Sequence, residues 1–172
     1  MLRVAGFSMR QQNTLQPDPN LPGNSVQTGE VHTPGVEVQA NGTVLRSLDY
    51  TVTYKPVNTV SATAEGKQPV TVSNNTASTW LHYTFRRGLP AGVGVGAGAP
   101  FSGASWATVT NTLSVPGFTL FDAALDYTME RWRFAVDARN VGDRRYVNGC
   151  SNQYFCAYGA SRTIVGSASF RF

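Results

Sequence analysis

The residues with the most evident chemistry are two cysteines that lie close together near the C-terminal end of the chain. Cys150 and Cys156 are the only cysteines among the 172 residues. A close pair of this kind suits an oxidising compartment, in which the two thiols join as a disulfide, and two free thiols are the alternative. A metal site is less favoured, because no histidine or further cysteine lies nearby to complete a tetrahedral set of ligands.

Aromatic residues surround this pair. Tyr154 and Phe155 lie between the cysteines, and Tyr158 follows the second one. If the cysteines are joined, they close a small hairpin that carries Tyr154 and Phe155. We expect no catalytic residue and no enzyme, because His32 and His82 are far apart in the sequence and neither lies near a nucleophile motif or a pair of carboxylates.

The segments on either side of the cysteines alternate between apolar and polar residues. From Arg131 to Arg139, large apolar residues such as Trp132 and Phe134 occupy one parity and mostly charged residues the other. Alternation of this kind predicts a β-strand. Arginines opposite Trp and Phe fit a wall between lipid and a watery interior better than a wall between a protein core and bulk solvent. The final segment, 164–172, repeats the pattern and ends on an aromatic residue.

The whole chain divides into eight segments of this type, joined alternately by long and short connections. Apolar residues occur at both parities of the first segment, so its outer face is not predicted. Strand pairing is expected to resume near Pro34 and to turn at Asn41-Gly42, the preferred pair for a two-residue hairpin. The predicted strands are 2–12, 34–40, 48–55, 77–86, 92–101, 121–129, 131–139 and 164–172, the long loops are 13–33, 57–73, 103–117 and 140–161, and the other short turns lie at 88–90 and 130.

Regular sorting of long and short connections is typical of an outer-membrane barrel, whose short turns face the periplasm and whose long loops face outside. Five arginines would then point into the lumen by parity, together with Trp80 and His82, which we interpret as packing residues. These arginines are Arg86, Arg131, Arg133, Arg139 and Arg171. On the strand at 92–101 glycines alternate with apolar residues, which indicates relief of crowding inside a barrel or, as the less favoured alternative, a ligand channel.

Composition supports β structure and excludes little else. Hydrophobic residues make up 41% and charged residues 14% of the chain, with 17 glycines. No stretch approaches the roughly 18 consecutive apolar residues of a membrane-spanning helix. The net charge is +4, but the basic residues are spread singly along the strands, so nucleic acid is not an expected partner.

An ordered series of motifs resembles one known family. The series consists of Phe118-Thr-Leu-Phe-Asp122, Asn140-Val-Gly-Asp-Arg-Arg-Tyr146, the cysteine pair, Tyr158-Gly-Ala-Ser-Arg-Thr163 and Phe170-Arg-Phe172, preceded by Asp18-Pro19, Gln27-Thr-Gly-Glu30, Gly35-Val-Glu37, Trp80 with Tyr83, and Gly92 to Gly98. In order and spacing it resembles the C-terminal part of TonB-dependent siderophore receptors of the ferrichrome and hydroxamate-type branch. The chain departs from the family pattern at Ser161 and at Val141-Gly142.

The resemblance implies an all-β fold: residues 1–172 would be a C-terminal segment of about eight antiparallel strands in a larger transmembrane barrel, without plug domain or signal peptide. It implies a receptor that transports ferric siderophores across the outer membrane of a Gram-negative bacterium, with this segment unable to transport alone. Expected partners are the ferric siderophore, outer-membrane lipid, the barrel-assembly machinery through Phe170 and Phe172, and the TonB complex only through a missing N-terminal region. No cofactor or metal bound by the chain itself is expected.

For the site, the resemblance implies that aromatic residues of extracellular loops line the siderophore pocket. Tyr158 is the first candidate, followed by Tyr154 and Phe155, and the disulfide is structural. The alternative is that these rings belong to the aromatic girdle at the outer membrane interface. Two rival functions stay open: a self-contained eight-stranded barrel with a structural or adhesive role, and a soluble β-sandwich that acts as a binding module.

Overall fold

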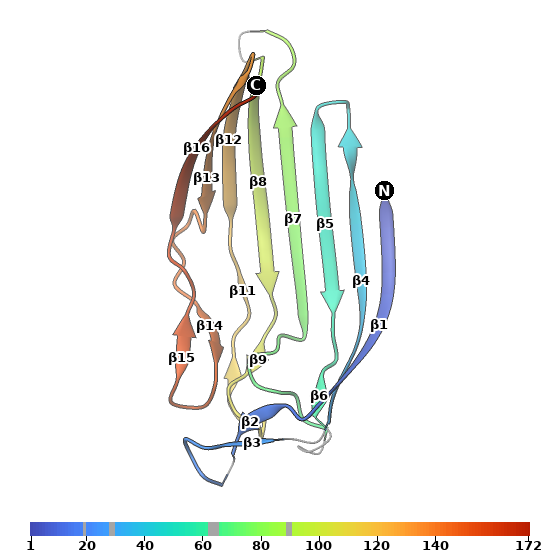
Figure 1. Cartoon of the computed structure of the whole chain (residues 1–172), viewed down its shortest axis with the longest axis vertical. Coiled ribbons are helices and arrows are strands. Elements are labelled where there is room, and N and C mark those ends of the chain that lie inside the picture. Colours follow the sequence, from blue (N-terminus) through green and yellow to red (C-terminus); the bar gives the residue numbers. More distant parts are fainter. Residues whose placement is uncertain (19, 28–29, 62–65, 89–90) are drawn as a thin grey trace.

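The chain forms one large antiparallel sheet, seen in Figure 1. The computed structural model describes residues 1–18, 20–27, 30–61, 66–88 and 91–172. Pro19, Thr28 and Gly29 of the motifs named above, and Leu89 and Pro90 of the turn predicted at 88–90, lie outside the described residues. Eight strands follow one another across the sheet in sequence order: β1 (Leu2–Gln12), β4 (Glu30–Val44), β5 (Leu48–Pro56), β7 (Asn75–Thr84), β8 (Val93–Ser102), β12 (Asp122–Met129), β13 (Trp132–Arg139) and β16 (Thr163–Phe170).

The predicted alternation of long and short connections is confirmed. In Figure 1 the short connections β4–β5, β7–β8 and β12–β13 lie at one end of the sheet, and the long ones lie at the other. Short strands within the long connections are β2 (Leu15–Pro17), β3 (Ser25–Gln27), β6 (Val60–Ser61), β9 (Ser105–Trp106), β10 (Ser114–Val115), β11 (Phe118–Thr119), β14 (Val147–Cys150) and β15 (Cys156–Tyr158). We refer to 13–29, 57–74, 103–117 and 140–162 as loops 1 to 4.

The turn predicted at Asn41-Gly42 is wrong. Both residues continue β4 and pair with Thr51 and Tyr50 of β5. The chain turns at residues 45–47, where Leu45 and Arg46 have φ of 53° and 60°. Gly42 is needed for another reason: a Cβ at this position would lie 3.1 Å from the Tyr50 ring, so the glycine leaves room for that ring.

Two predicted strand ends also differ from the structure. β4 begins at Glu30 rather than near Pro34, because its register with β1 continues through Pro34 until Glu30 meets Gln12. β16 ends at Phe170, and Phe172 is fully exposed beyond it. Arg86, Arg131 and Arg171 lie outside the strands, so strand parity does not place them in a lumen.

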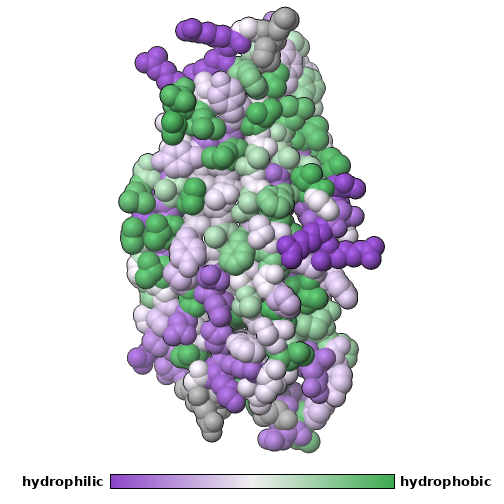
Figure 2. All heavy atoms as spheres, turned by 180° about the vertical axis from the view of Figure 1, so that it is seen from behind, coloured by the Kyte–Doolittle hydropathy of each residue, from purple (hydrophilic) through white to green (hydrophobic). Residues whose placement is uncertain are grey.

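The two faces of the sheet have opposite polarity, and the apolar face is the more exposed one. Leu125, Trp132, Phe134 and Phe170 are 53, 43, 44 and 41% exposed, whereas Asp126 on the other face is 8% exposed. Figure 2 shows hydrophobic side chains spread over the strand region of one face, with hydrophilic ones beyond the strand ends. This arrangement confirms the predicted orientation, because the oily side chains do not converge on a dry centre.

Among the described residues, no helix is long and apolar enough to cross a membrane.

The glycines of β8 make room for side chains of its two neighbouring strands, β7 and β12. A Cβ at Gly96 would lie 2.6 Å from the Trp80 ring, and a Cβ at Gly94 would lie 2.7 Å from both His82 Nε2 and Asp126 Oδ1. Trp80 and His82 are thus packed across this strand, and the interpretation of the glycines as relief of crowding is confirmed.

The outer edges of β1 and β16 have no partner strand among the described residues. A closed eight-stranded barrel is therefore not what this chain forms. A sandwich with a dry core between two sheets is excluded too, because the apolar face of the sheet is exposed. Both rival architectures are wrong for the described part of the chain.

Asn140 anchors loop 4 to the end of the sheet. Its side chain donates from Nδ2 to the carbonyl oxygens of Arg144 and Ala160 at 2.9 and 3.1 Å, and its Oδ1 accepts from the Arg144 N–H at 2.9 Å. Its own N–H donates to Asp122 Oδ1 at 2.8 Å. Asn140 is 3% exposed and has φ of 51°, a conformation that asparagine tolerates better than most residues. One side chain thus holds both ends of the loop.

We expect Gly96→Val to destabilise the barrel, because the new side chain would overlap the Trp80 ring. Overpacking of this kind costs about 1 to 3 kcal/mol. The matched control is Gly166→Val, since a Cβ at Gly166 meets nothing within 4 Å. The measurement is the temperature at which the folded receptor, purified from membranes, converts to its unfolded form on gels. Equal shifts for both variants would contradict the packing role.

The Asn140 anchor of loop 4 can be tested in a similar way. Asn140→Ala should loosen this loop by about 2 to 4 kcal/mol, because three hydrogen bonds to the backbone of Arg144 and Ala160 are lost. Asn148→Ala is the control, because Asn148 lies in the same loop but is exposed. Limited proteolysis of the receptor should cleave residues 140–162 faster in the Asn140 variant only. Cleavage at the wild-type rate would show that other contacts hold the loop.

Candidate ligand-binding site at the long-loop end

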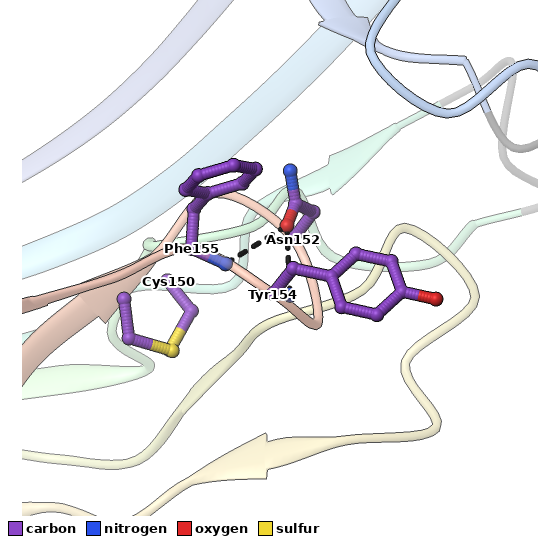
Figure 3. The surroundings of a disulfide bond; sticks show 5 residues. Cys150, Asn152, Tyr154 and Phe155 are labelled. Atoms are coloured by element: carbon purple, nitrogen blue, oxygen red, sulfur yellow. Dashed lines mark hydrogen bonds between the residues drawn. A yellow bond between two sulfur atoms is a disulfide. The ribbon is translucent and has the colours of Figure 1, made fainter.

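The β14–β15 hairpin forms the tip of loop 4, and the two cysteines link its strands. Cys150 and Cys156 face each other in the hairpin register and form a disulfide. Asn152 shapes the tip, because its Oδ1 accepts from the N–H groups of Tyr154 and Phe155 at 2.8 and 3.0 Å. Figure 3 shows these bonds and the two aromatic rings pointing away from each other. The tip is thus a short turn with exposed rings on both sides.

The disulfide belongs to a small hydrophobic core that joins loops 3 and 4. Cys150 is 3% exposed and clusters with Ala107 and Val115 of loop 3, which are 0 and 5% exposed, and with Val147. Within the described part of the chain, this cluster of buried hydrophobic residues lies outside the large sheet. Loops 3 and 4 therefore form one packed unit.

Loop 2 is tied to the same unit by hydrogen bonds. The Gln68 N–H donates to Asn111 Oδ1 at 2.8 Å, and Asn111 Nδ2 donates back to the Gln68 carbonyl at 2.9 Å. The Trp106 indole N–H donates to Gln68 Oε1 at 3.0 Å. Loop 2 also approaches loop 4 closely: a Cβ at Gly149 would lie only 3.2 Å from the Thr71 side chain. Three loops that are distant in sequence thus hold one another.

A cavity of about 410 Å³ lies where loop 1 meets the tips of loops 3 and 4. Its polar groups are hydroxyls, amides and one carboxylate, and two aromatic residues complete it. The lining residues are Asp18, Pro22, Gly23, Ala107, Thr108, Val109, Thr110, Thr112, Ser151, Asn152, Gln153, Tyr154 and Phe155. A volume of this size and a lining of this kind suit a small organic ligand.

The structure separates the three predicted aromatic residues. Tyr154 and Phe155 line the cavity and are 73 and 71% exposed. Tyr158 is 78% exposed and lies on β15, away from the cavity lining. Sequence reasoning did not single out Tyr146, whose ring packs against Phe118 with centroids 4.2 Å apart and covers Gly159. The sequence held one indication of this packing: Gly159 follows Tyr158, and a bulkier residue at this position would overlap the Tyr146 ring.

Charged side chains are absent from the tips of two loops. Residues 103–117 and 146–161 contain no aspartate, glutamate, lysine or arginine. Asp18 is the only charged residue that lines the cavity within the described part of the chain. No group of three or more histidine, cysteine, aspartate or glutamate side chains placed to hold a metal ion is found there either. The site is thus suited to a ligand recognised by hydrogen bonds and aromatic contact.

The polar face of the sheet carries a separate charged cluster. His82 Nε2 lies 2.7 Å from Asp126 Oδ1, and Arg133 Nη2 lies 3.6 Å from the same oxygen. Nearer the loops, Trp80, Asp122, Asp137 and Arg139 line a hollow of about 500 Å³. Arg133 and Arg139 are therefore on the polar face, as predicted, and the first is paired with a carboxylate.

Comparisons with known proteins agree with this architecture. A family model described as "TonB dependent receptor-like, beta-barrel" matches residues 1–141. The ferrichrome outer membrane transporter/phage receptor of Escherichia coli is 32% identical over 98% of this chain, and the ferrioxamine B receptor of Salmonella typhimurium is 30% identical over 98%. The chain spans about a quarter of each relative, 24 and 25%.

Solved structures show the same fold. The siderophore receptor PiuA of Acinetobacter baumannii superposes with a TM-score of 0.76 at 24% identity, covering 98% of this chain and 26% of the receptor. The ferric yersiniabactin uptake receptor FyuA of Yersinia pestis gives a TM-score of 0.77 at 17% identity, covering 99% of this chain and 27% of the receptor. With its apolar sheet face exposed and its loops sorted to one end, the chain belongs to the TonB-dependent receptor β-barrel family of the outer membrane of Gram-negative bacteria.

Proposed function

We propose that this chain supplies part of the barrel wall and part of the external binding site of a receptor that transports ferric siderophores, and that it catalyses no reaction. The observation that carries this proposal is the cavity formed by loops 1, 3 and 4 above a sheet with an exposed apolar face. The names of the similar receptors support the choice of ligand class. Both sheet edges are open, so further strands are needed for transport.

Other partners follow from the same architecture. Lipid covers the apolar face, because the exposed side chains there would be unfavourable in water. Phe170 and Phe172 serve the barrel-assembly machinery as an aromatic C-terminal signal. The TonB complex acts through a part of the receptor outside these residues. The chain itself holds no cofactor, and the ferric complex is the transported ligand.

Tyr154 and Phe155 are the residues proposed to contact the ligand inside the cavity, because they line it. Tyr158, on the adjacent strand of the same hairpin, is proposed as a contact at the entrance. The hairpin is held by the disulfide and by Asn152, so the rings are presented without ordering a flexible loop on binding. A held loop of this kind favours affinity.

The lack of cations at the cavity favours an uncharged ferric complex. Three hydroxamate anions neutralise one ferric ion, whereas three catecholate dianions leave a strongly anionic complex. A buried anion needs a cationic partner, and Asp18 is the only charged residue in the cavity lining within the described residues. We therefore propose a tris-hydroxamate as the ligand class.

The aromatic contacts can be tested by single substitutions in the native-length receptor. Tyr154→Ala and Phe155→Ala should each raise the Kd for ferrichrome by about tenfold, because each removes a ring from the cavity. Tyr154→Phe is the control and should retain most of the affinity. Measurement is by fluorescence quenching or calorimetry on purified receptor.

Tyr158→Ala distinguishes a ligand contact at the entrance of the cavity from a contact inside it. We expect a smaller rise in Kd than for Tyr154→Ala, because Tyr158 lies outside the cavity lining. If all three alanine variants bind with unchanged Kd, the rings belong to an interface girdle and the assigned ligand contacts are wrong. If the wild-type receptor binds no ferric siderophore, the proposed function itself fails.

The charge of the ligand can be tested separately. Wild-type receptor should bind a ferric tris-hydroxamate at least about tenfold more tightly than a ferric tris-catecholate. Thr110→Lys, at the cavity, should raise affinity for the catecholate complex at low salt and lose this effect as salt screens the charge. Thr110→Gln is the uncharged control. Tighter binding of the catecholate by the wild type would exclude the proposed ligand class.

A further inference from the structure

Positive charge gathers at the short-turn end of the sheet. Each of the three short connections and the residues after β16 carry arginine: Arg46, Arg86, Arg87, Arg131 and Arg171. All five are exposed. Glu130 is the only acidic residue in these connections, and none of the five arginines forms an ion pair with a described carboxylate. We call these five residues the arginine rim.

A large apolar residue is the direct neighbour of arginine at every one of these places. Leu45 precedes Arg46, Phe85 precedes Arg86, Trp132 follows Arg131, and Arg171 lies between Phe170 and Phe172. Leu45 and Phe172 are 86 and 105% exposed. The Trp132 and Phe170 ring centroids lie 4.9 Å apart, so two of these neighbours form one exposed aromatic surface.

The rim adjoins the surface that lipid covers. Trp132 and Phe170 belong to the apolar face, together with Tyr127 and Phe134. Figure 2 shows hydrophilic side chains projecting just beyond the hydrophobic surface at this end. The opposite end differs, because the tips of loops 3 and 4 carry no charged residue. Arginine occurs at the base of loop 4 too, at Arg144, Arg145 and Arg162, so the rim is distinguished by the exposed apolar side chains beside its arginines.

We propose that the arginine rim binds the headgroups of anionic phospholipids in the leaflet on the short-turn side of the membrane. The guanidinium group matches phosphate oxygens with two parallel hydrogen bonds. Aromatic and apolar neighbours place each arginine at the depth of the headgroups, where tryptophan and tyrosine prefer to lie. Attraction of arginine to an anionic lipid surface then adds up over several separate turns.

A lipid surface fits these observations better than an acidic protein. The arginines come from four places spread across the sheet, and at three of these places the adjacent apolar side chain is exposed. Such pairs suit a planar boundary between hydrocarbon and charged headgroups. An acidic protein surface would account for Arg46 but not for the exposed Leu45 beside it.

The test uses the native-length receptor in nanodiscs of phosphatidylcholine mixed with phosphatidylglycerol. Native mass spectrometry measures how many molecules of each lipid the released receptor retains. Wild type should retain phosphatidylglycerol preferentially. A variant with Arg86→Gln, Arg87→Gln and Arg131→Gln should lose this preference by about fivefold for each arginine removed at low salt, and by less as salt is added.

The control variant removes the same charge at the other end of the strands, by Arg144→Gln, Arg145→Gln and Arg162→Gln. Its lipid preference should equal that of the wild type. Unchanged phosphatidylglycerol retention in the rim variant, or an equal loss in both variants, would overturn the proposal. So would a wild-type receptor that retains both lipids equally but captures an acidic periplasmic protein through the rim. Ferric siderophore binding, measured in parallel, should stay unchanged in the rim variant, so this test is independent of the proposed ligand.

Discussion

The whole structure depends on the backbone hydrogen-bond ladder of the sheet. When the apolar face of a sheet meets lipid, moving its apolar side chains into a protein core would gain no free energy. The backbone N–H and C=O groups on the lipid side also find no water to bond with. They must bond to neighbouring strands, which explains why the eight main strands pair with one another in sequence order. Side-chain packing then serves the opposite face. Trp80 fills the space over the β8 glycines, and Asp126 holds His82 and Arg133.

The long loops are free of this constraint, and they fold in the ordinary way of water-exposed protein. Ala107, Val115 and Cys150 form the buried apolar cluster of the described residues, and it lies outside the sheet. Gln68 and Asn111 bind loop 2 to loop 3, while Asn140 fixes the base of loop 4. Two kinds of stability therefore coexist in one chain. The sheet is stabilised by pairing and the loops by a small core, so changes in the loops can alter binding without unfolding the wall.

Strand alternation could be recognised from sequence because it is local and repeats every second residue. The turn at Asn41-Gly42 was wrong because strand pairing prevailed over the local turn preference: Gly42 pairs with Tyr50, and this register places the turn at residues 45–47. The site was harder to predict. The resemblance named Tyr158 first and then Tyr154 and Phe155. Of these three, the last two line the cavity, which also requires Asp18 and Thr110 from loops far away in sequence. Contacts between loops that are distant in sequence leave no periodic pattern by which they could be predicted.

The distribution of charge along the strands links the two ends of the molecule. The tips of loops 3 and 4 are uncharged although they are exposed to water, where charge would cost nothing and would favour solubility. The short turns, which are equally exposed, carry four arginines and the residues after β16 a fifth. Solubility alone would treat both ends alike. The two proposals account for this difference: a ligand held by hydrogen bonds at the loop tips, which charged side chains would bind less well, and an anionic headgroup layer at the short turns, which arginine would bind better.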